Sequence, residues 1–170
     1  DFSSLLPPSL GPAEFFEPGS TRGNPVEARL ASLPGTRLEY LVGVFHDSTD
    51  ELITDYLVAP NAAAAFGTPV LLVAPVRITG KESAVFGEGA WHFSDAWKIT
   101  LGGRYFDTRL STDTASSGPL VGAATDVAGK SSQRGFSPKA SLTWSPTGDF
   151  LYYALVSKGF RIGGPNISAA

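Results

Sequence analysis

Residues 81–107 read Lys81-Glu-Ser-Ala-Val-Phe-Gly-Glu-Gly-Ala-Trp-His-Phe-Ser-Asp-Ala-Trp-Lys-Ile-Thr-Leu-Gly-Gly-Arg-Tyr-Phe-Asp107. Two segments of alternating polarity flank a turn at 93–97, and successive side chains of a strand point to opposite faces. One face of the predicted hairpin is therefore apolar and aromatic. The other face carries Glu88, His92, Lys98 and Arg104. Such a hairpin fits either a soluble sandwich with one wet face or a membrane barrel with lipid outside and water within.

The composition favours a β-rich chain and excludes several classes of protein. The 170 residues include 19 Gly and 13 Pro, with 11% aromatic and only 17% charged residues, which is typical of an all-β, turn-rich chain. A net charge of −3 predicts no nucleic-acid partner. The absence of cysteine excludes disulfides, thiol nucleophiles and cysteine-ligated metals.

The sequence contains no candidate membrane helix. Its longest apolar run, residues 70–74, is bounded by Pro69 and Pro75 and is far shorter than the roughly 18 residues that a helix needs to cross a bilayer. A helical membrane protein is excluded, whereas a β-barrel stays open. Because the chain has no Met and opens in a Pro-rich stretch, we expect it to be an internal piece of a longer protein.

Alternating polarity predicts six strands, and Pro and Gly mark the turns between them. The predicted strands are 24–32, 37–46, 82–93, 98–109, 135–145 and 150–161. Residues 1–22 hold several prolines, which remove backbone donors, so an irregular loop is predicted there.

Short turns alternate with long connections along the chain. The short turns are 33–36, 94–97 and 145–149, and the long loops are 47–79 and 110–134. In an antiparallel meander all short turns then lie at one end, as in outer-membrane barrels with tight periplasmic turns and long extracellular loops. A soluble domain rarely carries two unstructured loops of that length. Residues 70–73 are apolar for a solvated loop, and we expect them to fold back or to extend the barrel wall.

Aromatic residues are predicted at both ends of the strands. Candidates for an aromatic girdle are Trp91, Phe93, Trp97 and Trp144 beside the short turns, and Tyr105 and Phe136 at the other strand ends, where Phe106 and Phe160 also occur. Two aromatic rows that flank an apolar band are favoured at membrane interfaces. The alternative is ordinary aromatic packing in a sandwich core.

Four segments resemble the barrel of TonB-dependent outer-membrane receptors. They are Glu82-Ser-Ala-Val-Phe-Gly-Glu88, Trp91-His-Phe-Ser-Asp-Ala-Trp-Lys-Ile-Thr-Leu-Gly-Gly-Arg-Tyr105, Phe136-Ser-Pro-Lys-Ala-Ser-Leu142 and Tyr153-Ala-Leu-Val-Ser-Lys-Gly-Phe-Arg161. The strings are specific in combination, and the resemblance covers about residues 24–166. It implies an all-β, antiparallel up-and-down meander of about six strands, which forms part of a large transmembrane β-barrel of roughly 22 strands with a plugged lumen.

The resemblance also implies a function. The family imports ferric siderophores, corrinoids, carbohydrates or other bulky nutrients, driven by the inner-membrane TonB complex. We therefore expect a receptor segment in the outer membrane of a Gram-negative bacterium. Its partners would be the lipid bilayer, a siderophore-like or other large solute and, through a plug domain, the TonB complex. Residues 1–170 contain no recognisable plug domain or coupling box, so they are expected to be a partial barrel. Neither an enzymatic activity nor a cofactor is expected.

Five ionisable residues are candidates for the lumen face of such a barrel: Glu39, Glu88, Lys98, Arg104 and Lys139. If the apolar faces meet lipid, these side chains point inward, either toward a plug and passing solute or simply into a solvated lumen. The hairpin is expected to place Glu88 close to Arg104, which predicts an ion pair between neighbouring strands.

No catalytic or metal site is predicted. The acidic stretch with His46, Asp47, Asp50, Glu51 and Asp55 has one His and no calcium-loop spacing, so a solvated loop is expected. His92 is expected at the membrane interface. No nucleophile elbow or ordered triad is recognisable. Ligand recognition is expected in the regions 47–79 and 108–134.

Two alternatives from other classes stay open. The first is a passive porin-like or structural outer-membrane barrel, and the second is a soluble all-β binding module. Neither open edge of a six-stranded piece has its backbone groups satisfied in lipid. We therefore expect residues 1–170 alone to aggregate in detergent-free buffer, whereas a soluble module would fold as a cooperative monomer.

Overall fold

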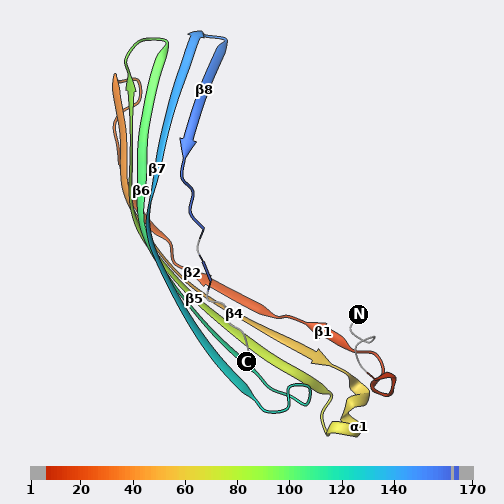
Figure 1. Ribbon diagram of the computed structural model, residues 1–170. Coiled ribbons are helices and arrows are strands. Elements are labelled where there is room, and N and C mark those ends of the chain that lie inside the picture. The colour runs from red at the N-terminus through yellow and green to blue at the C-terminus, as the bar shows by residue number, and fades with distance from the viewer. Residues whose placement is uncertain (1–6, 162, 165–170) are drawn as a thin grey trace.

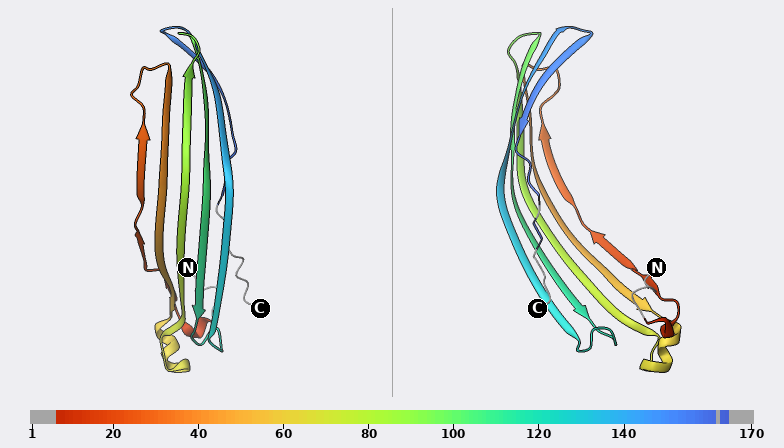
Figure 2. Two further views of the ribbon diagram at one scale, coloured as in Figure 1. Left: turned by 90° about the vertical axis from the view of Figure 1, so that its left-hand side faces the viewer. Right: turned by 45° about the vertical axis from the view of Figure 1, so that its right-hand side comes forward.

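The computed structural model describes residues 7–161 and 163–164 and consists of one antiparallel sheet. Its strands lie in the order β1-β4-β5-β6-β7-β8, and β2 and β3 also pair with β4. Figures 1 and 2 show a single curved wall, with the long strands side by side. The elements are η2 (Pro8–Leu10), β1 (Glu14–Phe16), β2 (Gly19–Gly23), β3 (Val26–Ala31), β4 (Leu38–Val58), η3 (Pro60–Ala62), α1 (Ala63–Phe66), β5 (Val70–His92), β6 (Trp97–Ser116), β7 (Thr125–Thr147) and β8 (Phe150–Ser157). The all-β antiparallel class predicted from the sequence is confirmed.

The first edge of the wall is one interrupted strand. β1, β2 and β3 pair in succession along β4, from Glu14 opposite Val58 to Ala31 opposite Leu41. Pro18 and Pro25 lie in the two gaps, where a missing N–H costs no ladder hydrogen bond. The predicted irregular loop is therefore wrong for β1 and β2, and its residues 1–6 lie outside the described part of the chain.

The predicted long loop 47–79 is mostly strand. β4 continues for 21 residues and β5 for 23, and their pairing runs from Leu38 opposite Trp91 to Val58 opposite Val70 with one shift. Polar residues led to the loop prediction, but side-chain polarity reports exposure to water and not the loss of backbone pairing. Only residues 59–69 connect the two strands, and residues 70–73 extend the wall.

The second predicted loop, 110–134, is shortened in the same way. β6 and β7 stay paired as far as Ser116 opposite Thr125, which leaves residues 117–124 as the connection. Gly118 and Gly122 adopt φ values of +117° and +68° there, a region that side chains rarely tolerate. The connection is thus a tight turn at the end of a long hairpin.

A small apolar core packs the end of the wall away from the short turns. Its members are Leu10, Ala13, Leu57, Ala59, Ala62 and Leu71. η2 contacts η3 at this end of the wall, close to α1 (Figure 1). Leu71 is 0% exposed, so this end of the wall is packed instead of solvated. None of the described helices is long and apolar enough to cross a membrane.

Candidate functional site

One face of the wall, here called the banded face, carries an apolar band. Strand register aligns side chains across β4 to β7, with Val44 opposite Val85 and Val85 opposite Tyr105. The band comprises Leu38, Tyr40, Val42, Val44, Val85, Trp91, Ile99, Leu101, Tyr105, Phe136, Leu142 and Trp144. Leu101, at its centre, is 58% exposed. A contiguous exposed apolar surface of this kind marks an interface with another apolar phase or partner.

A row of aromatic rings bounds the band beside the short turns. Ring centroids are 5.8 Å apart for Trp91 and Phe93, 6.2 Å for Phe93 and Trp97, and 5.5 Å for Trp97 and Trp144. Tyr152 of β8 continues the row at 5.4 Å from Trp144. The four predicted girdle residues at this end are thus brought together. Tyr152 was missed because β8 is apolar on both faces, which hides its orientation from periodicity.

A second aromatic row bounds the other side of the band. Tyr105 and Phe136 lie directly opposite each other on β6 and β7. Eight residues separate Trp97 from Tyr105, or about 27 Å along the strand. A strand tilt of about 35–45° makes this roughly 20 Å along the membrane normal, on the scale of the roughly 25 Å apolar band of membrane barrels. Phe106 does not join this row: it points to the opposite face, is 1% exposed and stacks on Phe160.

Beyond Tyr105 the banded face becomes polar within two residues. Asp107 receives a 2.6 Å hydrogen bond from Arg134, and His46 Nδ1 lies 2.9 Å from Ser83 Oγ. Farther along, Arg77 bonds to Asp50 at 2.6 Å. That hydrogen bond lowers the pKa of Asp50 below its ordinary range, although desolvation opposes it. The apolar band therefore ends sharply on the side away from the short turns.

The five predicted lumen candidates share the face opposite the band, here called the opposite face. Glu39, Glu88, Lys98, Arg104 and Lys139 all have the alternate strand phase. Lys139 bonds to Glu88 at 2.6 Å. No ion pair involves Lys98 among the residues that the structure describes.

The predicted ion pair between Glu88 and Arg104 is wrong. Register places Glu88 opposite Gly102 and Arg104 opposite Phe86, so two residues separate the predicted partners along the ladder. Arg104 pairs instead with Glu82, at 2.5 Å from Nη2 to Oε1. Ladder position alone does not select Glu82, which lies farther than Glu88 from Phe86 along β5. Glu88 is instead bonded to Lys139, and the long Arg104 side chain reaches Glu82.

Arginines and phenylalanines form an alternating row around Arg104. The Arg104 guanidinium lies 5.1 Å from the Phe45 ring and 5.9 Å from the Phe86 ring. Arg29, which pairs with Glu27, extends the row beyond Phe86, because its guanidinium lies 5.8 Å from the centroid of the Phe86 ring. Cation–π attraction and ion pairing together hold these charges in fixed positions. The row lies on the opposite face, across β3 to β6.

The remaining candidates do not converge on a metal or catalytic site. All five residues of the acidic stretch lie in β4 instead of a loop, so they alternate between the two faces. His46 and Asp50 are on the banded face, and Asp47, Glu51 and Asp55 are on the opposite face. Within the described residues no group of three His, Cys, Asp or Glu side chains suits a metal ion. His92 Nε2 lies 3.8 Å from Glu39, whose carboxylate accepts a 2.7 Å bond from Gly35 N–H.

An antiparallel wall with an apolar band between two aromatic rows and ionic side chains behind it has the features of a transmembrane β-barrel. A family model described as "TonB dependent receptor-like, beta-barrel" matches residues 11–170. The chain therefore belongs to this family.

Among solved structures, the chain is similar to the ferric yersiniabactin uptake receptor FyuA from Yersinia pestis, with a TM-score of 0.73 and 21% sequence identity. The alignment covers 84% of this chain and 21% of the FyuA chain, so the chain spans about a fifth of that receptor. At this identity the likeness concerns the fold. No curated protein matches the chain.

Proposed function

We propose that the chain forms part of the wall of an outer-membrane receptor that takes up a ferric siderophore or another bulky nutrient, with energy supplied through TonB. The observation that carries the proposal is the apolar band between aromatic rows, in a chain that matches the receptor family over residues 11–170. The ligand named for FyuA makes ferric yersiniabactin one of the first solutes to test.

In this proposal the banded face meets lipid and the opposite face lines the lumen. An arginine or lysine on the lipid face near the bilayer midplane costs about 2–4 kcal/mol, and Leu101 and its neighbours leave the band free of charge. Glu39, Glu88, Lys98, Arg104 and Lys139 then face the lumen, where a plug or solute passes. The short turns face the periplasm.

The long strands then project beyond the outer leaflet. Val70 lies fifteen residues from Val85 along β5, or about 50 Å of strand. The same argument gives β6 about 35 Å between Tyr105 and Ser116. Regions 47–79 and 108–134 thus form a paired wall outside the membrane, and we propose that solute recognition involves this wall together with the connections 59–69 and 117–124.

The test uses the complete receptor gene in a strain that lacks its own uptake systems for iron chelates. Uptake of radiolabelled iron is measured with a panel of ferric siderophores, with and without a functional TonB. Uptake that needs both the receptor and TonB is the expected result. Entry that persists without TonB would favour the passive barrel instead, and residues 1–170 folding as a soluble cooperative monomer would contradict the membrane assignment.

A further inference from the structure

Beyond the second aromatic row, the opposite face continues as a surface that we call the inner wall. It begins past the line of Phe45, Ala84, Phe106 and Gly135, which lie opposite one another on β4 to β7. Its carboxylates are Asp47, Glu51 and Asp55 on β4 and Glu82 on β5. Within the described residues of these four strands, no Lys or Arg past that line has the phase of the inner wall. The charge that these strands present there is therefore entirely negative.

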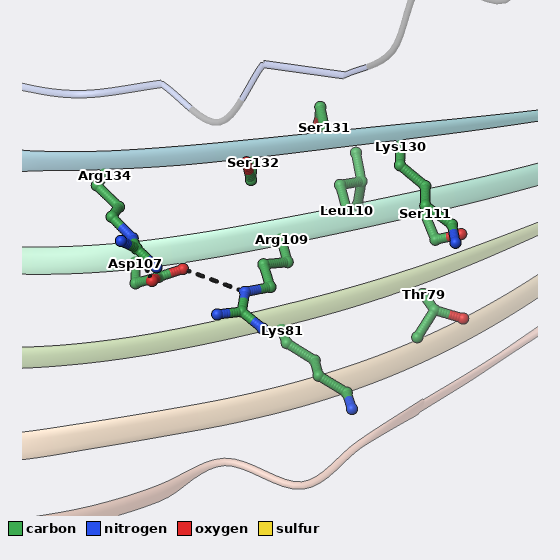
Figure 3. Close-up of a pocket in the computed structure, with 10 residues that line it drawn as sticks. All are labelled: Thr79, Lys81, Asp107, Arg109, Leu110, Ser111, Lys130, Ser131, Ser132 and Arg134. Carbon is green, nitrogen blue, oxygen red and sulfur yellow. Dashed lines mark hydrogen bonds and ion pairs between the residues drawn. The ribbon is translucent and has the colours of Figure 1, made fainter.

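The cations of these strands at the same level all lie on the banded face. They are Arg77, Lys81, Arg109, Lys130 and Arg134. Several have acidic partners on that face: Figure 3 shows Arg109 and Arg134 beside Asp107, and Arg77 pairs with Asp50. Arg161 follows β8, which is separated from β4 by β5, β6 and β7. General solubility would not require cations to be kept off one face, so the division points to a role for the negative charge.

Three of the carboxylates form a column along β4. Asp47, Glu51 and Asp55 follow one another at intervals of four residues, or about 13 Å of strand per step. None of the three forms an ion pair within the part of the chain that the structure describes. Asp55 Oδ1 is also buried without a hydrogen-bond partner there. The steps are too wide for a shared metal ion, so the column is a charged path along the wall.

Apolar side chains of β5 border this column. Ile78 lies opposite Glu51 and Ala74 lies opposite Asp55, with Val76 between them on the same face. Apolar surroundings screen a charge less than water does, and low-dielectric walls strengthen the field of the charges that they border. The column therefore acts at longer range than the same three acids would on a fully wetted surface.

A hollow of about 240 Å³ lies at the end of the column nearest the aromatic row. Its polar lining comprises Asp47, Thr49, Glu51, Glu82 and Thr108, and it includes Lys81 and Arg109, whose strand phase is that of the banded face. Gly80 leaves the space open, because a Cβ atom there would have only Leu110 within 4 Å. Since Glu82 pairs with Arg104, the unpaired carboxylates of the hollow are those of Asp47 and Glu51.

We propose that the inner wall selects solutes that carry ammonium or other cationic groups over anionic ones, an inference that narrows the proposed transport function and rests on it. Carboxylates accept charge-assisted hydrogen bonds from ammonium groups, and a surface of one sign raises the local concentration of oppositely charged solutes. Anionic phenolate or carboxylate groups are instead held by Arg and Lys, which the described residues of β4 to β7 do not place on the inner wall. A chelate with a free amine therefore fits this wall better than a negatively charged ferric tricatecholate.

The first test measures the charge preference without knowledge of the transported solute. Thr49→Cys places a thiol between Asp47 and Glu51 on the inner wall, in a complete receptor that has no other reactive thiol and is inserted in phosphatidylcholine vesicles. The thiol is modified with a cationic reagent, trimethylammonioethyl methanethiosulfonate, and with an anionic one, sulfonatoethyl methanethiosulfonate, and each rate is divided by the rate with 2-mercaptoethanol. We expect the cationic reagent to be favoured about tenfold, and by less at high salt.

Matched variants show whether the column is the cause. Asp47→Asn/Glu51→Gln/Asp55→Asn should remove most of the preference, whereas Asp50→Asn/Asp107→Asn/Asp113→Asn makes the same charge change on the banded face and should retain it. Glu51→Gln alone should weaken the preference, which keeps the test decisive if the triple variant does not insert.

A thiol on the other face supplies a further control. Ser48→Cys is one residue away but lies opposite Lys81 on the banded face, so it should show no preference for the cationic reagent. Equal rates for the two reagents at Thr49→Cys, or a preference that survives the loss of the inner carboxylates, would overturn the proposal.

The second test asks whether transport follows the same preference. Uptake of radiolabelled iron is measured for a linear ferric trihydroxamate that ends in an ammonium group, for its neutral N-acetyl derivative, for its anionic N-succinyl derivative and for a ferric tricatecholate. We expect the ammonium form to enter fastest and the tricatecholate slowest. Faster import of the anionic chelates would contradict the inference and leave TonB-driven transport standing. If no chelate enters, the proposed transport fails, while the thiol rates still decide the charge preference of the wall.

Discussion

Phe106 on β6 lies against Gly135 on β7, and a Cβ atom on Gly135 would come within 2.7 Å of Phe106 Cζ. Phe106 has no room to withdraw, since it is 1% exposed and its ring is stacked on Phe160 at 3.8 Å. The absence of a side chain at Gly135 therefore allows the ring to cover the neighbouring strand.

The first prediction concerns this contact. Gly135→Ala in the complete receptor is expected to lower the free energy of unfolding by about 1–3 kcal/mol, because the added methyl overpacks a closed contact. Urea-induced unfolding in lipid vesicles measures it. Gly89→Ala is the matched control, since nothing lies within 4 Å of its Cβ position. The double variant Gly135→Ala/Phe106→Leu should recover part of the loss; no recovery would show that the ring is not the obstacle.

The second prediction concerns the partner of Arg104. A double-mutant cycle with Glu82→Gln and Arg104→Gln is expected to give a coupling free energy of about 1 kcal/mol, as for a partly buried ion pair. The same cycle with Glu88→Gln should give a coupling near zero, because Glu88 pairs with Lys139. A larger coupling for Glu88 than for Glu82 would contradict the assignment of Glu82 as the ion-pair partner of Arg104.

The third prediction tests which face meets lipid. Leu101→Arg places a charge midway between the aromatic rows and is expected to destabilise the vesicle-inserted receptor by about 2–4 kcal/mol. Ser141→Arg, on the adjacent strand but with the phase of the opposite face, is the control and should cost clearly less. The measurement is again urea-induced unfolding, and equal losses for both variants would argue against a lipid-facing band.

The fourth prediction is a pH dependence outside the band. Arg77 lowers the pKa of Asp50 in the folded protein, so the stabilisation is present above the unfolded pKa of about 3.9 and is lost as pH falls through the folded pKa. Both side chains are exposed, so the effect is small. Below about pH 4 the wild type should lose slightly more stability than Asp50→Asn, as judged from unfolding midpoints. Asp95→Asn, in a turn, is the control and should retain the wild-type acid dependence.

The lengths of the strands were the feature that sequence patterns predicted least accurately. Residues 47–58 alternate polar and apolar side chains only loosely, so they were predicted to be loop, yet they pair with β5 without interruption as far as Leu57. Ladder hydrogen bonds depend on a partner strand of equal length, and that partner lies some 25 residues away in the chain. A local pattern does not contain this information.

The ionisable residues of the opposite face show a second difference between what the sequence predicted and what the structure contains. All five predicted lumen candidates share one face, as alternation indicated, but their ion pairs were not predictable. A change of one residue in where the turn between β5 and β6 is centred exchanges Glu88 for Phe86 opposite Arg104. The choice of Glu82 as ion-pair partner depends further on side-chain conformation and on the bond between Lys139 and Glu88. Sequence periodicity sets the face of a side chain, whereas the geometry of the turn sets its neighbour.

The hairpin of residues 81–107 shows which features the sequence determined and which the tertiary structure determined. Its sequence alone determined that Leu101 and Arg104 lie on opposite faces, because the period of two is a property of every strand. Only the tertiary structure decided that Tyr105 meets Phe136, that Asp107 meets Arg134 and that Lys81 shares their face. Those contacts join residues about 25 to 30 positions apart, and pairing of whole strands brings them together.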